Sequence, residues 1–223
     1  MRYVIAFAMA AVMLLAAGVS ADPLPPATQP AAPDLQLSKP VRDNGADFEA
    51  VAQAKWVVPP LNGKTTIEMG LKVTNRTEKM LRINVFDTVQ IHMEDLQGLP
   101  LDCVKVRDAT FIPEPLLLKS GESQVISRKA TLAWIENARG LRLSGPDGAG
   151  GTWHIDIPQP GKYPLRFSHA NNDERLKSVL ARPAKHAVDP KEAPFWMGKI
   201  TTPEMTVEVV EVPTQAPAVN AGR

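Results

Sequence analysis

The chain has 223 residues, 22% of them charged, and its 25 basic and 24 acidic residues leave a formal net charge of +1. This balance argues against a nucleic-acid-binding protein, because such proteins carry the basic excess that phosphate neutralisation requires. The single cysteine, Cys103, cannot form an intramolecular disulfide, so core packing alone must stabilise the fold.

Residues 1–21 have the pattern of a cleavable secretory signal peptide. Arg2 supplies a positive start, an apolar run extends from Val4 to Val19, and small residues end the segment before Asp22. A membrane-spanning helix needs about 20 apolar residues, so the run is short for an uncut anchor, which is the alternative. No cysteine stands directly after the run, which argues against a lipid-anchored lipoprotein. We expect an exported protein, periplasmic or extracellular, with no later membrane span.

Both ends of the remaining chain are rich in proline. Residues 22–40 contain six prolines, which stiffen the chain into extended conformers, and residues 213–223 are a Pro/Ala-rich tail. We expect both to be disordered, with one domain between them at residues 41–212.

Alternating apolar and polar residues dominate the first half of this domain. Residues 66–74 place apolar side chains at every odd position, and residues 81–85 repeat the pattern after an Asn75-Arg76-Thr77-Glu78 turn, which predicts a hairpin. Asn75-Arg76-Thr77 also matches a glycosylation acceptor, although we favour a role in the turn. A further strand is predicted at residues 89–93, followed by a turn at residues 95–98. Residues 116–118 lead through a tight reversal at residues 119–122 into a returning strand at 124–132.

The second half continues in the same way. Residues 152–157 alternate with Trp153 inward, Pro160-Gly161 predicts a turn, and residues 162–168 and 204–212 are the last two strands. Tyr163 stands two residues before the core position Leu165, which is the spacing of the tyrosine corner in immunoglobulin-like domains. We therefore predict an all-β fold, a single immunoglobulin-like β-sandwich of about eight to nine strands.

Part of the chain resembles bacterial immunoglobulin-like modules, including the intracellular proteinase inhibitor domains of bacilli. The resemblance rests on residues 73–82, on Asp95-Leu96-Gln97-Gly98 and on Leu118-Lys119-Ser120-Gly121-Glu122, about 50 residues in all. Residues 100–103 stand where that inhibitor family carries a Trp-containing segment. The resemblance implies the sandwich fold and, as an alternative function, a proteinase-inhibitor-like module presenting residues 113–115 or 169–194 as a loop.

The sequence carries no nucleophile elbow, no phosphate-binding loop and no dinucleotide fingerprint, so we expect neither catalysis nor a cofactor. His92 with Glu94, and His154 with Asp156, lie on the polar faces of their strands, and a metal site or enzyme using these pairs is a second alternative. Cys103 alternates with charged residues and is expected to be a buried, inert thiol; a reactive thiol or an intermolecular disulfide is the other possibility.

The 35-residue connection between the last two strands is the best candidate for a binding site, because loops of that length are usually functional or disordered. We therefore predict a non-enzymatic accessory or envelope module that binds a protein or glycan. Its candidate partner-binding residues are Arg182, His186, Phe195, Trp196 and Met197. The alternative for Phe195-Trp196-Met197 is that these side chains plug one end of the sandwich.

Overall fold

The computed structural model describes residues 34–107, 112–136, 140–174, 177 and 193–211. The predicted signal peptide and C-terminal tail lie outside these residues. The described chain forms sixteen β-strands, more than the eight or nine expected. They are β1 (Leu35–Leu37), β2 (Val41–Asp43), β3 (Ala46–Gln53), β4 (Lys55–Val57), β5 (Lys64–Asn75), β6 (Leu81–Ile83), β7 (Val89–Glu94), β8 (Pro100–Leu101), β9 (Cys103–Arg107), β10 (Leu116–Leu118), β11 (Ser123–Trp134), β12 (Leu141–Pro146), β13 (Gly151–Ile157), β14 (Gly161–Asn171), β15 (Gly198–Thr201) and β16 (Met205–Val210).

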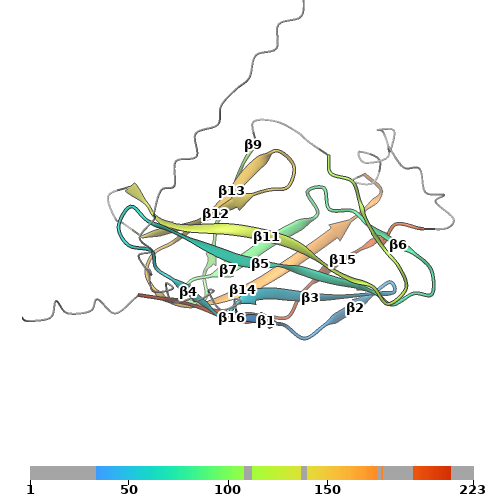
Figure 1. Ribbon diagram of the computed structural model, residues 1–223, viewed down its shortest axis with the longest axis horizontal. Helices are drawn as coiled ribbons and strands as arrows, with labels where there is room; N and C mark the ends of the chain where they lie inside the picture. Colours follow the sequence, from blue (N-terminus) through green and yellow to red (C-terminus); the bar gives the residue numbers. More distant parts are fainter. Residues whose placement is uncertain (1–33, 108–111, 137–139, 175–176, 178–192, 212–223) are drawn as a thin grey trace, which may run out of the picture. The chain divides into compact units, whose positions relative to one another are not determined.

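The fold is all-β and contains three sheets (Figure 1). An eight-stranded sheet, here the large sheet, has the order β1-β3-β5-β11-β12-β13-β9, with β2 also pairing with β3. A six-stranded sheet, here the small sheet, has the order β4-β16-β14-β7-β8, with β15 also pairing with β14. Strands β6 and β10 form a two-stranded sheet. None of the described residues forms a helix of the length and apolarity that crossing a membrane would require.

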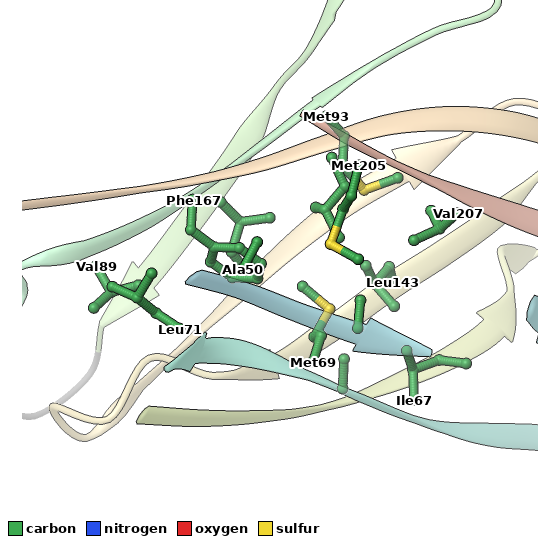
Figure 2. Close-up of a cluster of buried hydrophobic side chains, with 14 of the residues drawn as sticks. Ala50, Ile67, Met69, Leu71, Val89, Met93, Leu143, Phe167, Met205 and Val207 are labelled. Atoms are coloured by element: carbon green, nitrogen blue, oxygen red, sulfur yellow. The ribbon is translucent and has the colours of Figure 1, made fainter. Parts of the chain in front are cut away.

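One hydrophobic core receives side chains from both the large and the small sheet. Figure 2 shows Leu71 and Leu143 of the large sheet gathered in one cluster with Met93, Phe167 and Val207 of the small sheet. All five are at most 1% exposed. Burial of such side chains is the main favourable term for the fold, at roughly 1.5–3 kcal/mol for each fully buried large residue.

Strand β5 confirms the alternation seen in the sequence, because Ile67, Met69, Leu71 and Val73 are all buried. The predicted strands at residues 89–93, 152–157, 162–168 and 204–212 are likewise present as β7, β13, β14 and β16.

Strand β3 was not predicted, because both of its faces are buried. Its buried and exposed positions therefore do not alternate along the sequence. Phe48 and Ala50 face the core, whereas Asp47 on the other face is only 3% exposed. The Asp47 carboxylate accepts hydrogen bonds from Arg42 (2.7 Å) and Arg76 (2.6 Å). The hydrogen bond from Arg42 is the largest of the effects that lower the pKa of Asp47 to about 2.

The two predicted hairpins are wrong. Strand β5 pairs with β3 and β11, while β6 pairs with β10, so each predicted return strand finds a partner far away in the sequence. Asn75 explains the change. Its buried side-chain amide donates to the carbonyl oxygens of Lys79 (2.8 Å) and Leu118 (3.0 Å), which joins the loop after β5 to the end of β10. These contacts confirm a turn role for Asn75, and they leave its side chain inaccessible to glycosylation in the folded chain.

Tyr163 makes the hydrogen bond that the sequence led us to expect. The buried Tyr163 donates its hydroxyl proton to the carbonyl oxygen of Gln159, four residues upstream, and Leu165 is fully buried in the core. Burial raises the pKa of the Tyr163 hydroxyl.

Ordered structure begins earlier than predicted, because β1 lies inside the segment 22–40 that we expected to be disordered. Strands β1 and β2 pair successively with β3 and are interrupted at residues 38–40. There the hydroxyl of Ser38 accepts the Ala50 N–H (2.9 Å), and Pro40 has no N–H to donate. A proline at a sheet edge is tolerated for that reason.

Candidate functional site

An open groove of about 490 Å³ lies where the chain passes from the small sheet to the large one. Strand β8 belongs to the small sheet and ends at Leu101, and β9 begins at Cys103 in the large sheet. The groove is lined along β7 by residues 90–94, at the crossover by residues 100–103, and by Lys105, Arg166 and Thr201.

Among the described strands, the two neighbours of β7 differ in length. Strand β14 pairs with β7 from Val89 to Met93, whereas β8 pairs only with Met93 and Glu94. Residues 90–92 of β7, which lie beyond β8, line the groove.

A chain of polar side chains crosses the outer face of the small sheet beside these residues. The Nε2 atom of His92 lies 2.8 Å from the hydroxyl oxygen of Ser168, and the guanidinium of Arg166 donates to the carboxylate of Glu94. Burial, and secondarily the positive charge of Arg166, lower the pKa of His92. The lowered pKa favours the neutral imidazole of His92, and the carboxylate of Glu94 is paired with the guanidinium of Arg166.

The opposite wall comes from the crossover. Leu101 and Cys103 are half-buried and pack against the core, and Asp102 between them is exposed. Cys103 is not part of a disulfide and is less buried than expected, because it stands at the edge of the large sheet. Its place in the wall gives the groove a small apolar surface.

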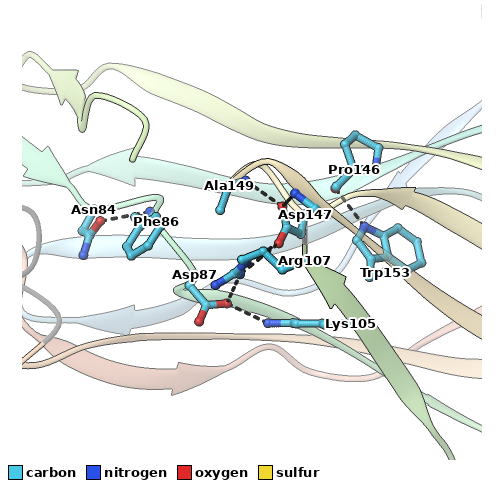
Figure 3. Close-up of polar contacts among 10 residues, drawn as sticks. Asn84, Phe86, Asp87, Lys105, Arg107, Pro146, Asp147, Ala149 and Trp153 are labelled. Carbon is cyan, nitrogen blue, oxygen red and sulfur yellow. Dashed lines mark hydrogen bonds and ion pairs between the residues drawn. The ribbon is translucent and has the colours of Figure 1, made fainter. Parts of the chain in front are cut away.

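Beyond this wall, an ion-pair network fixes the edge strand β9 (Figure 3). Lys105 donates to the carboxylate of Asp87 at 2.8 Å, and Arg107 contacts both Asp87 (3.3 Å) and Asp147 (2.9 Å). Burial alone would raise the pKa of Asp147, but hydrogen bonds from the N–H groups of Ala149 and Gly151, and from Arg107, lower it. The Gly-rich segment after β12 is therefore a turn built around Asp147.

The predicted partner-binding residues are not brought to this groove. Arg182 and His186 lie outside the described residues. Trp196 is 1% exposed and packs its ring against Phe48 and His169, with centroid distances of 4.8 and 4.9 Å. The prediction that Trp196 is an exposed anchor is therefore wrong. Its buried ring agrees with the alternative that it fills the interior of the fold.

Phe195 and Met197 are half-buried beside it. The guanidinium carbon of Arg82 lies 4.5 Å from the centre of the Phe195 ring, and the Met197 carbonyl oxygen accepts a hydrogen bond from Asn44 (2.7 Å). These contacts attach residues 195–197 to β6 and to the turn that follows β2.

A buried polar cluster reinforces that attachment. The Nε2 atom of His169 lies 2.8 Å from the Asn84 carbonyl oxygen, and the Asn84 amide donates to Asn171 (2.9 Å). Asn171 in turn donates to the Trp196 carbonyl oxygen (2.8 Å). His169 and Asn171, which the sequence places at the start of the long connection, therefore belong to the core.

The two His–carboxylate pairs lie on different sheets, His92 with Glu94 on β7 and His154 with Asp156 on β13. The carboxylate of Asp156 pairs with Arg142 at 2.7 Å, as that of Glu94 pairs with Arg166. Within the described ranges, no group of three or more His, Cys, Asp or Glu side chains is placed to hold a metal ion.

The segment considered as an inhibitory loop, residues 113–115, leads into β10, with Pro113 and Pro115 half-buried and Glu114 exposed. The rest of that hypothesis concerns residues 169–194, most of which lie outside the described residues.

Comparison with known proteins adds no assignment: no protein-family model and no curated protein sequence matches the chain.

Proposed function

We propose that this chain is an exported, immunoglobulin-like β-sandwich that binds a polypeptide partner in the groove between β7 and β9. Export is supported by the charged start, apolar run and small-residue end of residues 1–21. The immunoglobulin-like assignment is supported by the order β16-β14-β7-β8, which corresponds to strands G, F, C and C′, and by the Tyr163 hydrogen bond at the start of β14.

The single observation that carries the proposal is the composition of the groove. It combines the apolar side chains of Leu101 and Cys103 with charged side chains of both signs. No Trp, Tyr or Phe is among its described lining residues. This lining offers no aromatic face on which a sugar ring could stack, which favours a polypeptide over a glycan.

The geometry of the Ser168–His92 contact favours binding over catalysis. A serine nucleophile must reach its substrate, whereas Ser168 is 8% exposed beneath His92. The contact fixes the imidazole as a hydrogen-bonding group on the rim of the groove.

Site-specific photocrosslinking tests this function. A photoreactive phenylalanine analogue replaces Asp102, which is exposed in the groove, or Leu61, which is 68% exposed on the loop before β5 and outside the groove. In the cells that make the protein, we expect a polypeptide adduct from position 102 and none from position 61. The proposal fails if position 102 gives no adduct, if both positions give the same adducts, or if the adduct resists protease but not glycosidase.

A further inference from the structure

We propose that Met197 is a site of reversible oxidation, and that its sulfoxide loosens the attachment of residues 195–197 to the buried polar cluster. Peroxides convert the thioether of methionine to a sulfoxide, which changes a flexible apolar side chain into a polar one. Residues 195–197 end the long connection that precedes β15, so oxidation acts at a different place from the groove. The inference does not depend on the function proposed for the groove.

Exposure separates the methionines of the folded chain. Five of them lie among the described residues, and Met69, Met93 and Met205 are buried in the core, at 2%, 1% and 7% exposed. Met80 and Met197 are half-buried, so part of each side chain meets solvent. Oxidation follows the access of the peroxide to the sulfur. We therefore expect Met80 and Met197 to react before the other three.

The sulfur of Met197 contacts a buried hydrogen-bond donor. Its Sδ atom accepts a hydrogen bond from the side-chain amide of Asn171 at 3.3 Å, and the same Nδ2 atom donates to the carbonyl oxygen of Trp196 at 2.8 Å. An asparagine amide has two N–H groups, one for each of these acceptors. Asn171 is only 2% exposed. The sulfur is thus one of the two acceptors that satisfy a buried amide.

The chemistry at this sulfur is a two-electron oxidation by hydrogen peroxide. A lone pair of Sδ attacks one peroxide oxygen, the O–O bond breaks, and the departing hydroxide takes the proton of the transferred oxygen and leaves as water. The sulfur is oxidised to the sulfoxide, and the peroxide is reduced. Methionine sulfoxide reductases reverse the change with electrons from a thiol, one enzyme acting on each sulfoxide epimer.

The added oxygen cannot enter the contact as it stands. An N–H···O hydrogen bond alone needs about 2.7–3.2 Å between nitrogen and oxygen, which is nearly the whole distance of 3.3 Å between Nδ2 of Asn171 and Sδ of Met197. If the oxygen faces Asn171, the sulfur must move away from it. If the oxygen faces solvent, a positively polarised sulfur stands where the acceptor was, and a buried N–H without an acceptor is costly. Oxidation therefore displaces Met197 or Asn171.

The contact matters because Met197 also helps to attach the chain. Its carbonyl oxygen accepts a hydrogen bond from Asn44 (2.7 Å) in the turn that follows β2, and the Asn171 amide that meets its sulfur also holds Trp196. Movement of the oxidised side chain acts on both hydrogen bonds. The Trp196 ring is packed in the core, so we expect a local loosening of residues 195–197 and not an unfolding of the domain.

Peptide mass spectrometry of the whole protein after treatment with hydrogen peroxide measures the first step. In the folded protein, we expect Met197 to be oxidised at least tenfold faster than Met93. In urea the two should react at the same rate, because their exposure no longer differs. Equal rates in the folded protein would overturn the proposal.

Two matched variants assign the consequence to one sulfur. Met80→Leu leaves Met197 as the half-buried methionine of the described chain, and Met197→Leu leaves Met80. After peroxide treatment, the midpoint of thermal unfolding of Met80→Leu should fall by at least about 2 °C and recover with both reductases and dithiothreitol. The midpoint of Met197→Leu should not change, because leucine cannot be oxidised. An equal fall in both variants would overturn the assignment to Met197.

The side-chain amide resonances of Asn171 in NMR spectra give a readout that stability alone does not. They should shift when Met80→Leu is oxidised and return after reduction. Those of Asn75, whose buried amide donates to the carbonyl oxygens of Lys79 and Leu118, should stay in place. A sulfoxide at Met197 that leaves the Asn171 resonances unchanged would overturn the proposed loosening. If Met80→Leu fails to fold, the same resonances in the unaltered protein decide.

Discussion

Replacing Asp47 by asparagine tests whether a buried charge on β3 contributes to stability. Asp47→Asn keeps the shape of the side chain and removes the charge that Arg42 and Arg76 contact. The ordinary pKa of 3.8 falls to about 2 in the folded chain. Because one pKa unit corresponds to about 1.4 kcal/mol, this difference is equivalent to about 2.5 kcal/mol. The side chains of Arg42 and Arg76 are 69% and 49% exposed, so solvent screens the pair, and about 1–2 kcal/mol is the better expectation.

The sign follows from the lowered pKa. The folded state holds the proton of Asp47 less tightly than the unfolded state does, so the Asp47 carboxylate contributes its full stabilising free energy above about pH 5. This stabilisation is lost as the pH falls from about 4 to about 2. Asp47→Asn should therefore lower the free energy of unfolding by about 1–2 kcal/mol at pH 7 and by much less near pH 2.

Urea unfolding at several pH values, followed by tryptophan fluorescence, measures this difference. Asp156→Asn is the matched control, because Asp156 also pairs with one arginine on a sheet but is half-exposed, as is Arg142. We expect that variant to change stability by less than about 0.5 kcal/mol at pH 7. A penalty for Asp47→Asn that is equally large at pH 2 and pH 7 would refute the charge-based explanation.

Three further substitutions probe the core. Trp196→Ala should cost about 3–5 kcal/mol in urea unfolding, since it empties a site filled by a fully packed indole; a loss under about 1 kcal/mol would mean that the ring is not packed as described. Tyr163→Phe removes one hydrogen bond and should cost about 0.5–1.5 kcal/mol, seen as a lower melting temperature. An unchanged melting temperature would contradict a stabilising corner. Gly145→Ala should cost about 1–3 kcal/mol, because its Cβ would lie 2.8 Å from the Lys129 carbonyl oxygen and 3.0 Å from the Trp153 ring. Wild-type stability in that variant would show that β11 and β12 can separate to admit a methyl group.

The positions of strands could be predicted from the sequence where one face of the strand is buried and the other is exposed to solvent. Residues 66–74 and 152–157 alternate cleanly, and β5 and β13 form there. The pattern fails in β3, where the polar side chain of Asp47 is buried and paired with two arginines. An alternation of apolar and polar residues shows that the two faces of a strand differ in burial, and in β3 both faces are buried.

Strand pairing could not be predicted from neighbouring segments. The turns at residues 75–78 and 119–122 carry ordinary turn residues, which suggests local hairpins. In the structure these turns lie side by side and are joined by the hydrogen bond from Asn75 to Leu118. A contact across 43 residues leaves no signal in either turn alone.

The groove was missed for a related reason. Leu101 and Cys103 share the alternation of a single strand, yet β8 ends at one and β9 begins at the other, in different sheets. The available signal was Pro100, which has no N–H and so is compatible with a strand that stops. The long connection drew attention to Trp196 because large aromatic residues suit both interfaces and cores, and composition does not distinguish the two.

The joint pairing of β5 with β11 and of β6 with β10 also has a consequence for the order in which the protein can fold. While the chain is being synthesised, β3 and β5 can pair early, but the second edge of β5 has no partner until residues 123–133 have been made. Ladders between such distant segments form slowly, typically in milliseconds to seconds. During that interval the edge of β5 that later pairs with β11, Lys64–Thr74, is unpaired. The newly made chain is therefore most prone to aggregate at a strand that lies between β3 and β11 once folding is complete.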